Sequence, residues 1–385
     1  MSPASADEIT VFLAGDVMTG RGIDQALAQP SSPELYESYV RDARDYLRLA
    51  EQANGAVPAP VSAAYVWGDA LAELGRAAPA LRIVNLETAV TTHRIPYPGK
   101  GIHYRMHPAN VGCLTAARLD CCVLANNHVI DWGHDGLAQT LATLRQAGIR
   151  TAGAGARLDE ALAPAALPLP GGGRLLVFAY ATESSGVPQA WAATAHRAGV
   201  ALLPEPGEAA AAEVAAEVAA HRRAGDRVIV SIHWGGNWGT HIPRGHRAFA
   251  HRLIELGSAD VVHGHSSHHP LPAEVHRGHL VLYGCGDLVN DYEGIGERGG
   301  LRSDVGCLYF ATLSRRDGTL RSLRIVPLQM RRLRLGPPDP VARGWLRDLL
   351  ALGDRQFGTR LQPHPDGGWL LASQQRGAAA RGPDS

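Results

Sequence analysis

The most informative stretch of the sequence is VVHGHSSHH, residues 261–269. It places four histidines in seven residues, directly after an apolar run at residues 260–262 that is predicted to be a buried strand. Solvated histidine tracts usually lie in polar low-complexity sequence, whereas this one follows an apolar strand. The stretch therefore predicts a metal site at the end of a strand.

Six further short apolar runs are predicted to be buried strands: residues 9–14, 81–84, 121–124, 175–179, 227–232 and 280–283. Amphipathic or Ala-rich segments with helical spacing separate them, at residues 34–53, 63–76, 135–147, 208–223 and 244–256. The alternation predicts an α/β sandwich with two central mixed sheets flanked by helices.

We expect one large domain over residues 8–335, followed by a helical extension at residues 336–373. Residues 1–7 and 374–385 are small, polar or Arg- and Gly-rich, which predicts disordered ends. Residues 167–173 predict a turn between two strands, and residues 305–331 predict a hairpin closed by Asp317-Gly318.

Composition excludes several classes of function. Hydrophobic residues make up 45% of the chain, enough for a sizeable core, and 37 basic residues balance 37 acidic ones. This balance argues against a nucleic-acid partner and favours a small or locally charged ligand. With no signal sequence and no long apolar stretch, we expect a cytoplasmic protein without a membrane anchor. The five cysteines form no CxxC pair, and most of them are expected to be small core residues.

The other predicted strands also end in residues that bind metals. Asp16 follows the first run, Glu87 the second, Asn127 and His128 the third, and His233 the fifth. Oxygen donors combined with imidazoles suit manganese, iron or zinc. Each residue also has an ordinary structural interpretation.

Among the structural alternatives, Asp16 is a helix N-cap, Glu87 a solvated loop acid and Asn127 a turn former. His128 is a packed histidine bonded to Asp131, and His233 is a core histidine. Consecutive strand ends that all deliver metal-binding residues favour the metal interpretation, because parallel strands bring their ends to one edge of a sheet.

These motifs resemble a known family. LAGDVMTGRGID, NLETAV, LANNHVIDWGHDG, SIHWG and VVHGHSSHHPLPAEVHRGHLVLYGCGDLVNDYEGI follow one another between residues 9 and 329, in the order typical of the CapA family of poly-γ-glutamate capsule-biosynthesis proteins. That family is similar to the calcineurin-like metallophosphoesterases. The resemblance implies a metallophosphoesterase-like sandwich that holds one or two divalent metal ions.

Carried over residue by residue, the resemblance implies that Asp16 binds the first metal, Glu87 bridges and Asn127 binds the second metal. It implies that His128 is the proton donor, and the remaining metal ligands would be His233, His265 and His268. Three positions depart from the wider pattern. Met18 stands where a metal-binding His is usual, Glu87 replaces an Asp, and GHSSH at residues 264–268 has a wider gap between its histidines. These departures also allow a weaker first metal site or the binding of a single metal ion.

The expected chemistry is metal-assisted hydrolysis, in which a metal-activated water attacks and His128 protonates the leaving group. Asp131 would fix the histidine tautomer. Candidate substrate-binding residues are Arg21, Tyr104, Arg105 and Asn237, each of which is equally well explained as part of a surface ion pair or polar contact.

The predicted function is that of a metal-dependent hydrolase, of the phosphoesterase type or acting on an amide. By resemblance, it would be linked to a poly-γ-glutamate or capsule-like polymer, with a small anionic substrate or γ-glutamyl polymer as ligand. The alternative is a non-catalytic assembly or binding protein for poly-γ-glutamate or an acidic peptide.

Overall fold

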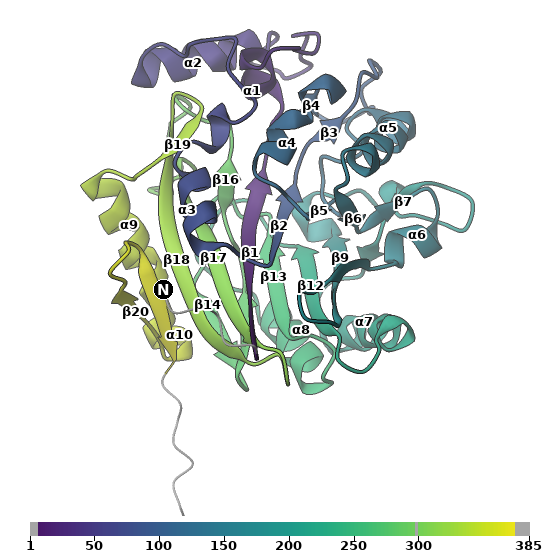
Figure 1. The fold of residues 1–385 in the computed structure, drawn as a ribbon. Helices are drawn as coiled ribbons and strands as arrows, with labels where there is room; N and C mark the ends of the chain where they lie inside the picture. Colours follow the sequence, from purple (N-terminus) through teal and green to yellow (C-terminus); the bar gives the residue numbers. More distant parts are fainter. Residues whose placement is uncertain (1–6, 297–298, 374–385) are drawn as a thin grey trace, which may run out of the picture.

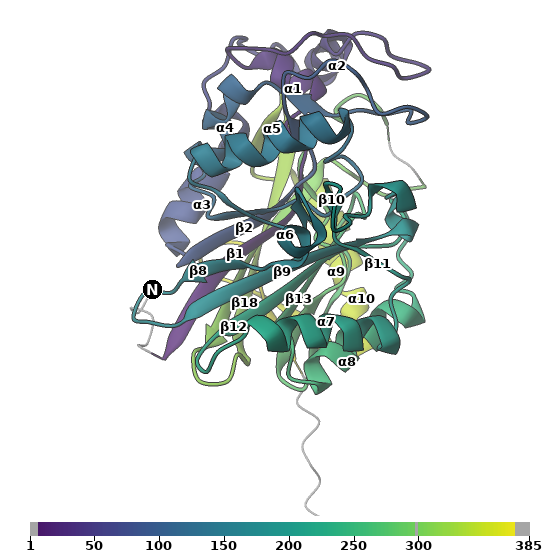
Figure 2. The same ribbon diagram turned by 90° about the vertical axis from the view of Figure 1, so that its right-hand side faces the viewer.

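The structure is a computed structural model that describes residues 7–296 and 299–373. Two large mixed sheets pack against each other, with helices on their outer faces (Figures 1 and 2). The predicted α/β sandwich with two central mixed sheets flanked by helices is therefore confirmed. The predicted disordered ends, apart from Asp7, lie outside the described residues.

The larger sheet contains ten strands, and β1, β2, β5 and β6 at its centre and one edge run parallel. The hairpin predicted between residues 305 and 331 is present as antiparallel β17 and β18. Across the sheet the order is β20 (Thr359–Pro363), β21 (Trp369–Ser373), β18 (Leu320–Arg331), β17 (Val305–Ser314), β1 (Glu8–Val17), β2 (Leu81–Leu86), β5 (Cys121–Val123) and β6 (Arg150–Ala152), with β16 (Asp287–Val289) paired to β1 and β19 (Arg334–Gly336) to β18.

The smaller sheet contains seven strands, of which β9, β12, β13 and β15 run parallel. Its order is β11 (Leu202–Leu203), β9 (Arg174–Thr182), β12 (Arg227–His233), β13 (Val261–His265), β15 (His279–Leu282) and β14 (Ala273–His276), with β8 (Ala165–Pro168) antiparallel to β9. Two small sheets pair β3 (Ala89–Val90) with β4 (Arg105–Met106) and β7 (Ala154–Gly155) with β10 (Gly199–Val200).

Strand β9 shows why the two sheets stack. Leu175, Val177 and Ala179 alternate with Leu176 and Phe178, and the two sets belong to different apolar clusters. The first set joins the core shared with the larger sheet, and the second packs under α7 (Glu208–His221) and α8 (Arg244–Glu255) (Figure 2). Because side chains alternate between faces of a strand, an apolar strand of this kind must be covered on both sides.

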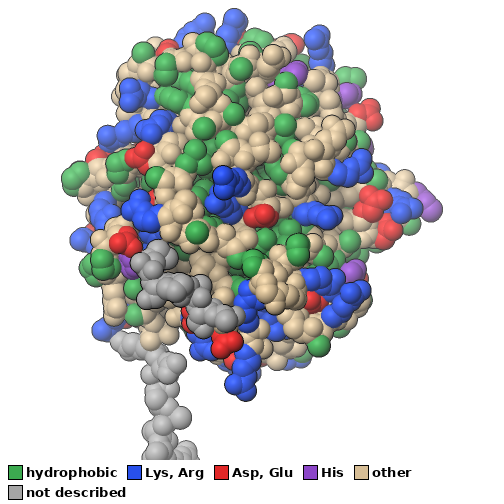
Figure 3. All heavy atoms as spheres, in the orientation of Figure 1, with side chains coloured by type: hydrophobic (Ala, Val, Ile, Leu, Met, Phe, Trp, Pro, Cys, Tyr) green, Lys and Arg blue, Asp and Glu red, His purple; other side chains and the backbone are tan. Residues whose placement is uncertain are grey.

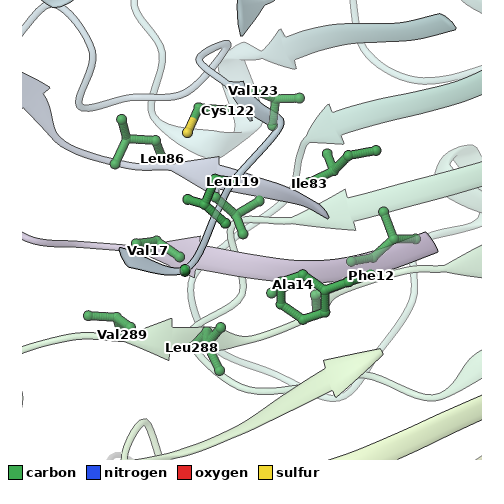
Figure 4. Close-up of a cluster of buried hydrophobic side chains, with 14 of the residues drawn as sticks. Phe12, Ala14, Val17, Ile83, Leu86, Leu119, Cys122, Val123, Leu288 and Val289 are labelled. Atoms are coloured by element: carbon green, nitrogen blue, oxygen red, sulfur yellow. The ribbon is translucent and has the colours of Figure 1, made fainter. Parts of the chain in front are cut away.

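The core at the centre of the larger sheet is built from β1, β2, β5 and β16. Figure 4 shows Phe12 and Val17 of β1, Ile83 of β2, Val123 of β5 and Val289 of β16 within one cluster of buried apolar side chains. The other helices are α1 (Arg21–Ala26), α2 (Arg44–Asn54), α3 (Ala70–Ala77), α4 (Gly112–Ala116), α5 (Gly133–Gln146), α6 (Leu158–Leu162), α9 (Pro340–Leu350) and α10 (Leu352–Phe357).

Three predicted elements differ from the structure. The helix expected at residues 63–76 is divided into a 3-10 turn at Tyr65–Trp67 and α3, with Gly68 at a φ of 43° between them. The helix expected at residues 34–53 begins only at Arg44, because residues 34–43 form a loop closed by a bridge between Glu34 and Asp42. Residues 336–373, expected to form a helical extension, contain α9 and α10 and then the hairpin β20–β21, which adds to the edge of the sheet at β18 (Figure 1). The WLLAS segment of β21 supplies backbone groups that pair with β18, and the TRLQP segment of β20 pairs with β21 in turn.

The surface agrees with the balanced composition. On the face shown in Figure 3, basic and acidic side chains are scattered over the surface instead of gathered by sign. All five cysteines are buried and free, as predicted. Within the two described ranges, no helix combines the length and the apolar character needed to span a membrane.

Candidate metal centre

The carboxyl ends of the parallel strands meet at one edge of the sandwich. Asp16 is the penultimate residue of β1, Glu87 follows β2, Asn127 follows β5, and His233 and His265 end β12 and β13. The register places His233 directly beside His265, and their Nδ1 atoms are 2.8 Å apart. The structure thus brings these strand ends together at one edge.

Two groups of three potential metal ligands share Asp16. One contains Asp16, His233 and His265, and the other contains Asp16, His268 and Asp287. Within each group the ligand atoms lie within 4.8 Å of one another, and all of these residues are buried. A carboxylate common to two groups is the arrangement expected when one oxygen ligand serves two neighbouring cations.

Glu87 and Asn127 lie around the first group. The Asn127 Oδ1 atom is 3.1 Å from His233 Nε2, and the Glu87 Oε1 atom is 4.0 Å from the same nitrogen. The Glu87 Oε2 atom is buried without a hydrogen-bond partner. A buried carboxylate oxygen without a partner is costly, so this atom identifies a place where a cation would be favourable.

Close backbone packing and a strained turn fix these positions. A Cβ atom at Gly15 would lie 2.0 Å from the Gly286 carbonyl oxygen, so only glycine lets β1 approach β16 and align Asp16 with Asp287. After β13, Ser266 has a φ of 102°, a region that non-glycine residues rarely adopt. This turn directs the Ser266 N–H toward Asp16 Oδ2, at 3.3 Å.

The acidic groups repel one another. Burial, together with the charge of Asp287, raises the pKa of Asp16 to about 7, and burial with Asp16 raises the pKa of Glu87 well above its usual value. Burial also lowers the pKa of both His233 and His265 well below the usual value, so these imidazoles are neutral. Neutral imidazoles and crowded carboxylates are the donor set that a divalent cation stabilises.

His128 lies at the rim of the first group. Its Nδ1 atom is 2.7 Å from Asp131 Oδ2, as the sequence predicted, and its Nε2 atom is 3.7 Å from Glu87 Oε1. The Tyr104 ring lies edge-on, with its centroid 4.4 Å from that of the imidazole. Burial lowers the pKa of His128 to about 4, with Asp131 opposing the shift. The Nε2 atom is thus the one directed toward the candidate metal ligands.

The four candidate substrate residues lie in different places. The Arg21 guanidinium is buried against Asp291 and Glu37. The Tyr104 hydroxyl is 2.7 Å from the Tyr292 hydroxyl. Arg105 donates to the carbonyl oxygens of His93 and Ser32 and packs over Trp132, so the structure does not bring it to the metal ligands.

A pocket of about 90 Å³ opens beside the second group. His268 and Asn237 both line it, and the backbone N–H of His268 donates to the backbone carbonyl oxygen of Asn237 at 2.9 Å. Arg21 and Tyr292 line the same pocket together with Trp238. Of the predicted substrate residues, Asn237 and Arg21 therefore face a space next to the candidate metal ligands.

Two residues of this region were not among the predicted site residues. Asp287 aligns with Asp16, and its Oδ1 atom lies 3.0 Å from His268 Nδ1. Lys100 contacts Asn127, His128 and Asp131 from a loop without periodicity. One signal for it was available, because Lys100 is the only lysine in the sequence.

A third group, His251, Glu274 and His276, lies on α8 and β14, away from this edge. Its carboxylate already accepts from the Tyr283 hydroxyl at 2.6 Å and lies 3.0 Å from His251. Arg247 is within 4.0 Å of the same carboxylate. We interpret this group as a polar network between helix and sheet.

The fold and the site define an α/β protein whose sheet edge gathers carboxylate, amide and imidazole donors around one shared aspartate. A family model described as bacterial capsule synthesis protein PGA_cap matches residues 10–292, and the chain belongs to that family. The resemblance to the CapA family that the motifs indicated is therefore confirmed.

Individual relatives agree with this assignment. The chain is 48% identical over 361 residues to a probable polyglutamine synthesis accessory protein of Mycobacterium tuberculosis, covering 94% of this chain and 95% of the relative. It is 25% identical over 288 residues to the PGA biosynthesis protein CapA of Bacillus subtilis, covering 74% of this chain and 64% of the relative.

Among solved structures, a phosphatase from Mycoplasma pneumoniae aligns with a TM-score of 0.46 and 13% identity, covering 88% of this chain and 96% of the phosphatase. A similarity of this size says nothing about the chemistry of the present chain.

Proposed function

We propose that this protein is a metal-dependent hydrolase of the phosphoesterase type, with His128 as the proton donor. The observation that carries the proposal is the position of His128, which is held by Asp131 on one side and faces Glu87 on the other. A protein that only binds its ligand has no need of an imidazole placed between a carboxylate anchor and the candidate metal ligands.

The residues present fit a metal centre. Asp16, His233, His265, Glu87 and Asn127 would hold one divalent ion, and Asp16, His268 and Asp287 would hold a second. Met18 stands where the wider pattern has a metal-binding histidine, and its sulfur lies 3.7 Å from the Tyr292 hydroxyl. In the second group, Asp287 supplies a carboxylate as a further potential ligand. Mixed oxygen and nitrogen donors favour manganese, iron or zinc.

When bound, such ions supply Lewis acidity, which makes a water molecule more nucleophilic and neutralises an anionic substrate group. The protein then supplies orientation and a proton. Asp131 accepts the Nδ1 hydrogen of His128 and would stabilise the imidazolium form, whose Nε2–H would protonate the leaving group. Burial of this region excludes bulk water and strengthens each polar interaction there.

The names of the relatives suggest the substrate class. Because the chain belongs to a capsule synthesis family and is similar to a polyglutamine synthesis accessory protein, we propose a small anionic ester or a γ-glutamyl chain as the ligand. The pocket beside His268 and Asn237 would receive one end of it.

The test is the variant His128→Ala, because His128 does not belong to either group of ligands. Protein purified without chelators would be assayed for bound metal and for hydrolysis of aryl phosphate mono- and diesters with added manganese. We expect unchanged metal content and turnover lowered about 100-fold or more, the usual contribution of a general acid. Wild-type protein that binds metal but hydrolyses nothing would favour the alternative, a non-catalytic binding or assembly protein.

A further inference from the structure

The pocket beside the candidate metal centre has aromatic walls. Its volume is about 90 Å³, and Trp238 and Tyr292 line it together with His268. The centroid of the His268 imidazole lies 5.3 Å from that of the Trp238 ring and 5.4 Å from that of the Tyr292 ring. Because His268 belongs to the second group of potential metal ligands, an anion bound to that group would have its substituent beside these two rings.

The mouth of the pocket is also apolar. Tyr39, from the loop before α2, and Ile295, from the loop after β16, both line it. These residues are 64% and 40% exposed, and they are two of the six large hydrophobic residues that are exposed in the described part of the chain. Exposed apolar side chains that gather at one pocket are typical of a binding site for an apolar group.

The positive charge in the pocket lining is already neutralised. Among the described residues that line the pocket, Arg21 is the only arginine or lysine. Its guanidinium donates to both carboxylate oxygens of Asp291, and its Nη1 atom donates to Glu37 Oε1 at 2.9 Å. The Tyr46 hydroxyl also donates to Glu37, and the Tyr46 ring centroid lies 3.7 Å from the guanidinium carbon. Two buried carboxylates thus face one guanidinium, so Arg21 has no surplus positive charge for a further anion.

We infer that this pocket binds the uncharged aromatic group of a small phosphate ester and does not receive the carboxylates of a γ-glutamyl chain. The inference rests on the proposed function for the phosphate group, which would lie at the candidate metal ligands. The side chains of Trp238 and Tyr292 can pack favourably against an aromatic ring. A γ-glutamyl chain has a carboxylate on every residue, and burying one beside Asp291 and Glu37 would be unfavourable.

The size of the pocket agrees with a single ring. A closed apolar cavity that holds one benzene molecule has a volume of about 150 Å³. The present pocket, at about 90 Å³, is smaller and opens to solvent, so a phenyl group would fill it with one edge left at the mouth. The ring would then lie between Trp238 and Tyr292 on one side and the exposed Tyr39 on the other.

The test measures binding without turnover. Methylphosphonate and phenylphosphonate have the same anionic head group and no ester bond, so neither is hydrolysed as an ester. Titration calorimetry of the full chain with added manganese gives both dissociation constants. We expect phenylphosphonate to bind about 10-fold more tightly, because only its ring contacts the pocket. Trp238→Ala should reduce this preference to about 2-fold, and Trp238→Phe, which keeps a ring, should retain most of it.

A second variant and a control separate ring binding from general damage. Tyr39→Ala removes an exposed ring at the mouth and should lower the preference for phenylphosphonate about 3-fold while the protein stays folded. Val341→Ala shortens an exposed apolar side chain of α9, outside the pocket lining, and should leave both dissociation constants unchanged. The same preference in the wild type, Trp238→Ala and Tyr39→Ala would overturn the inference.

The charge of the pocket is tested with 4-carboxyphenylphosphonate. We expect this compound to bind about 10-fold more weakly than phenylphosphonate, because its carboxylate would lie near two carboxylates and one guanidinium. Equal or tighter binding of the carboxylated ring would show that a positive charge is available there, against the inference. The same conclusion would follow if γ-glutamylglutamate competed with phenylphosphonate and bound more tightly.

The inference and the proposed function can fail separately. If the wild-type protein hydrolyses no ester, the proposed function fails, and the phosphonate constants still decide the inference because they need no turnover. Hydrolysis of phenyl phosphate by a protein that binds both phosphonates equally would refute the inference alone. Binding of neither phosphonate in the presence of manganese would also overturn it.

Discussion

Replacing Asp16 with asparagine should stabilise the metal-free protein. Burial and Asp287 raise the pKa of Asp16 from 3.8 to about 7. Because the pKa in the folded state is the higher one, the stability linked to this group is complete below about pH 4 and is lost as the pH rises through about 7. At pH 8 the ionised carboxylate therefore costs about 4 kcal/mol of folding free energy.

Part of this gain is offset in Asp16→Asn. The carboxylate accepts from Asn85 Nδ2 at 2.7 Å and from the Ser266 N–H at 3.3 Å, and an asparagine offers one oxygen for these two donors. Losing one acceptor for a buried donor costs about 1–2 kcal/mol. We therefore expect a net stabilisation of about 2 kcal/mol at pH 8.

The assay is urea unfolding of both proteins after treatment with a chelator, at pH 5 and pH 8. The advantage of Asp16→Asn should be largest at pH 8 and small at pH 5, where the wild-type carboxyl is mostly protonated. Adding manganese or zinc should reverse the order, because only the wild type keeps the shared ligand. A variant that is less stable without metal at pH 8, or a difference that does not depend on pH, would refute this reasoning.

Two further predictions concern the same edge of the sheet. The stabilisation of the wild-type protein by a divalent ion, measured as the shift of the unfolding midpoint, should increase from pH 5 to pH 8. The reason is that the raised pKa values of Asp16 and Glu87 make protons compete with the metal at low pH. A shift that does not depend on pH would argue against these carboxylates as ligands. Gly15→Ala should destabilise the protein by about 3 kcal/mol or more and reduce its metal content, because the new Cβ atom would lie 2.0 Å from the Gly286 carbonyl oxygen. Gly75→Ala serves as the control, since the added Cβ atom there meets nothing within 4 Å. Equal stability and metal content in both variants would contradict the close approach of β1 and β16.

Much of the site could be predicted because it follows from the direction of the strands. Asp16, Glu87, Asn127, His233 and His265 each follow an apolar run, and parallel strands bring such residues to one edge. Motif order then identified the family. The roles of these residues as metal ligands remain predictions.

The parts that were missed depend on contacts that no periodicity reveals. Asp287 begins the three-residue strand β16, which is placed by the close packing of Gly15 against Gly286. Lys100 lies in a loop, and only the folded chain brings it to His128. The C-terminal hairpin was missed because it is added to the sheet through the pairing of β21 with β18, which a local pattern does not show.

In the proposed metal centre, two cations would share Asp16. The most direct measurement is an anomalous difference map from crystals grown with manganese, recorded at the manganese absorption edge. We predict one peak between Asp16, His233 and His265 and a second between Asp16, His268 and Asp287. A map without a peak at Asp16, or with manganese only beside His251 and His276, would contradict the account.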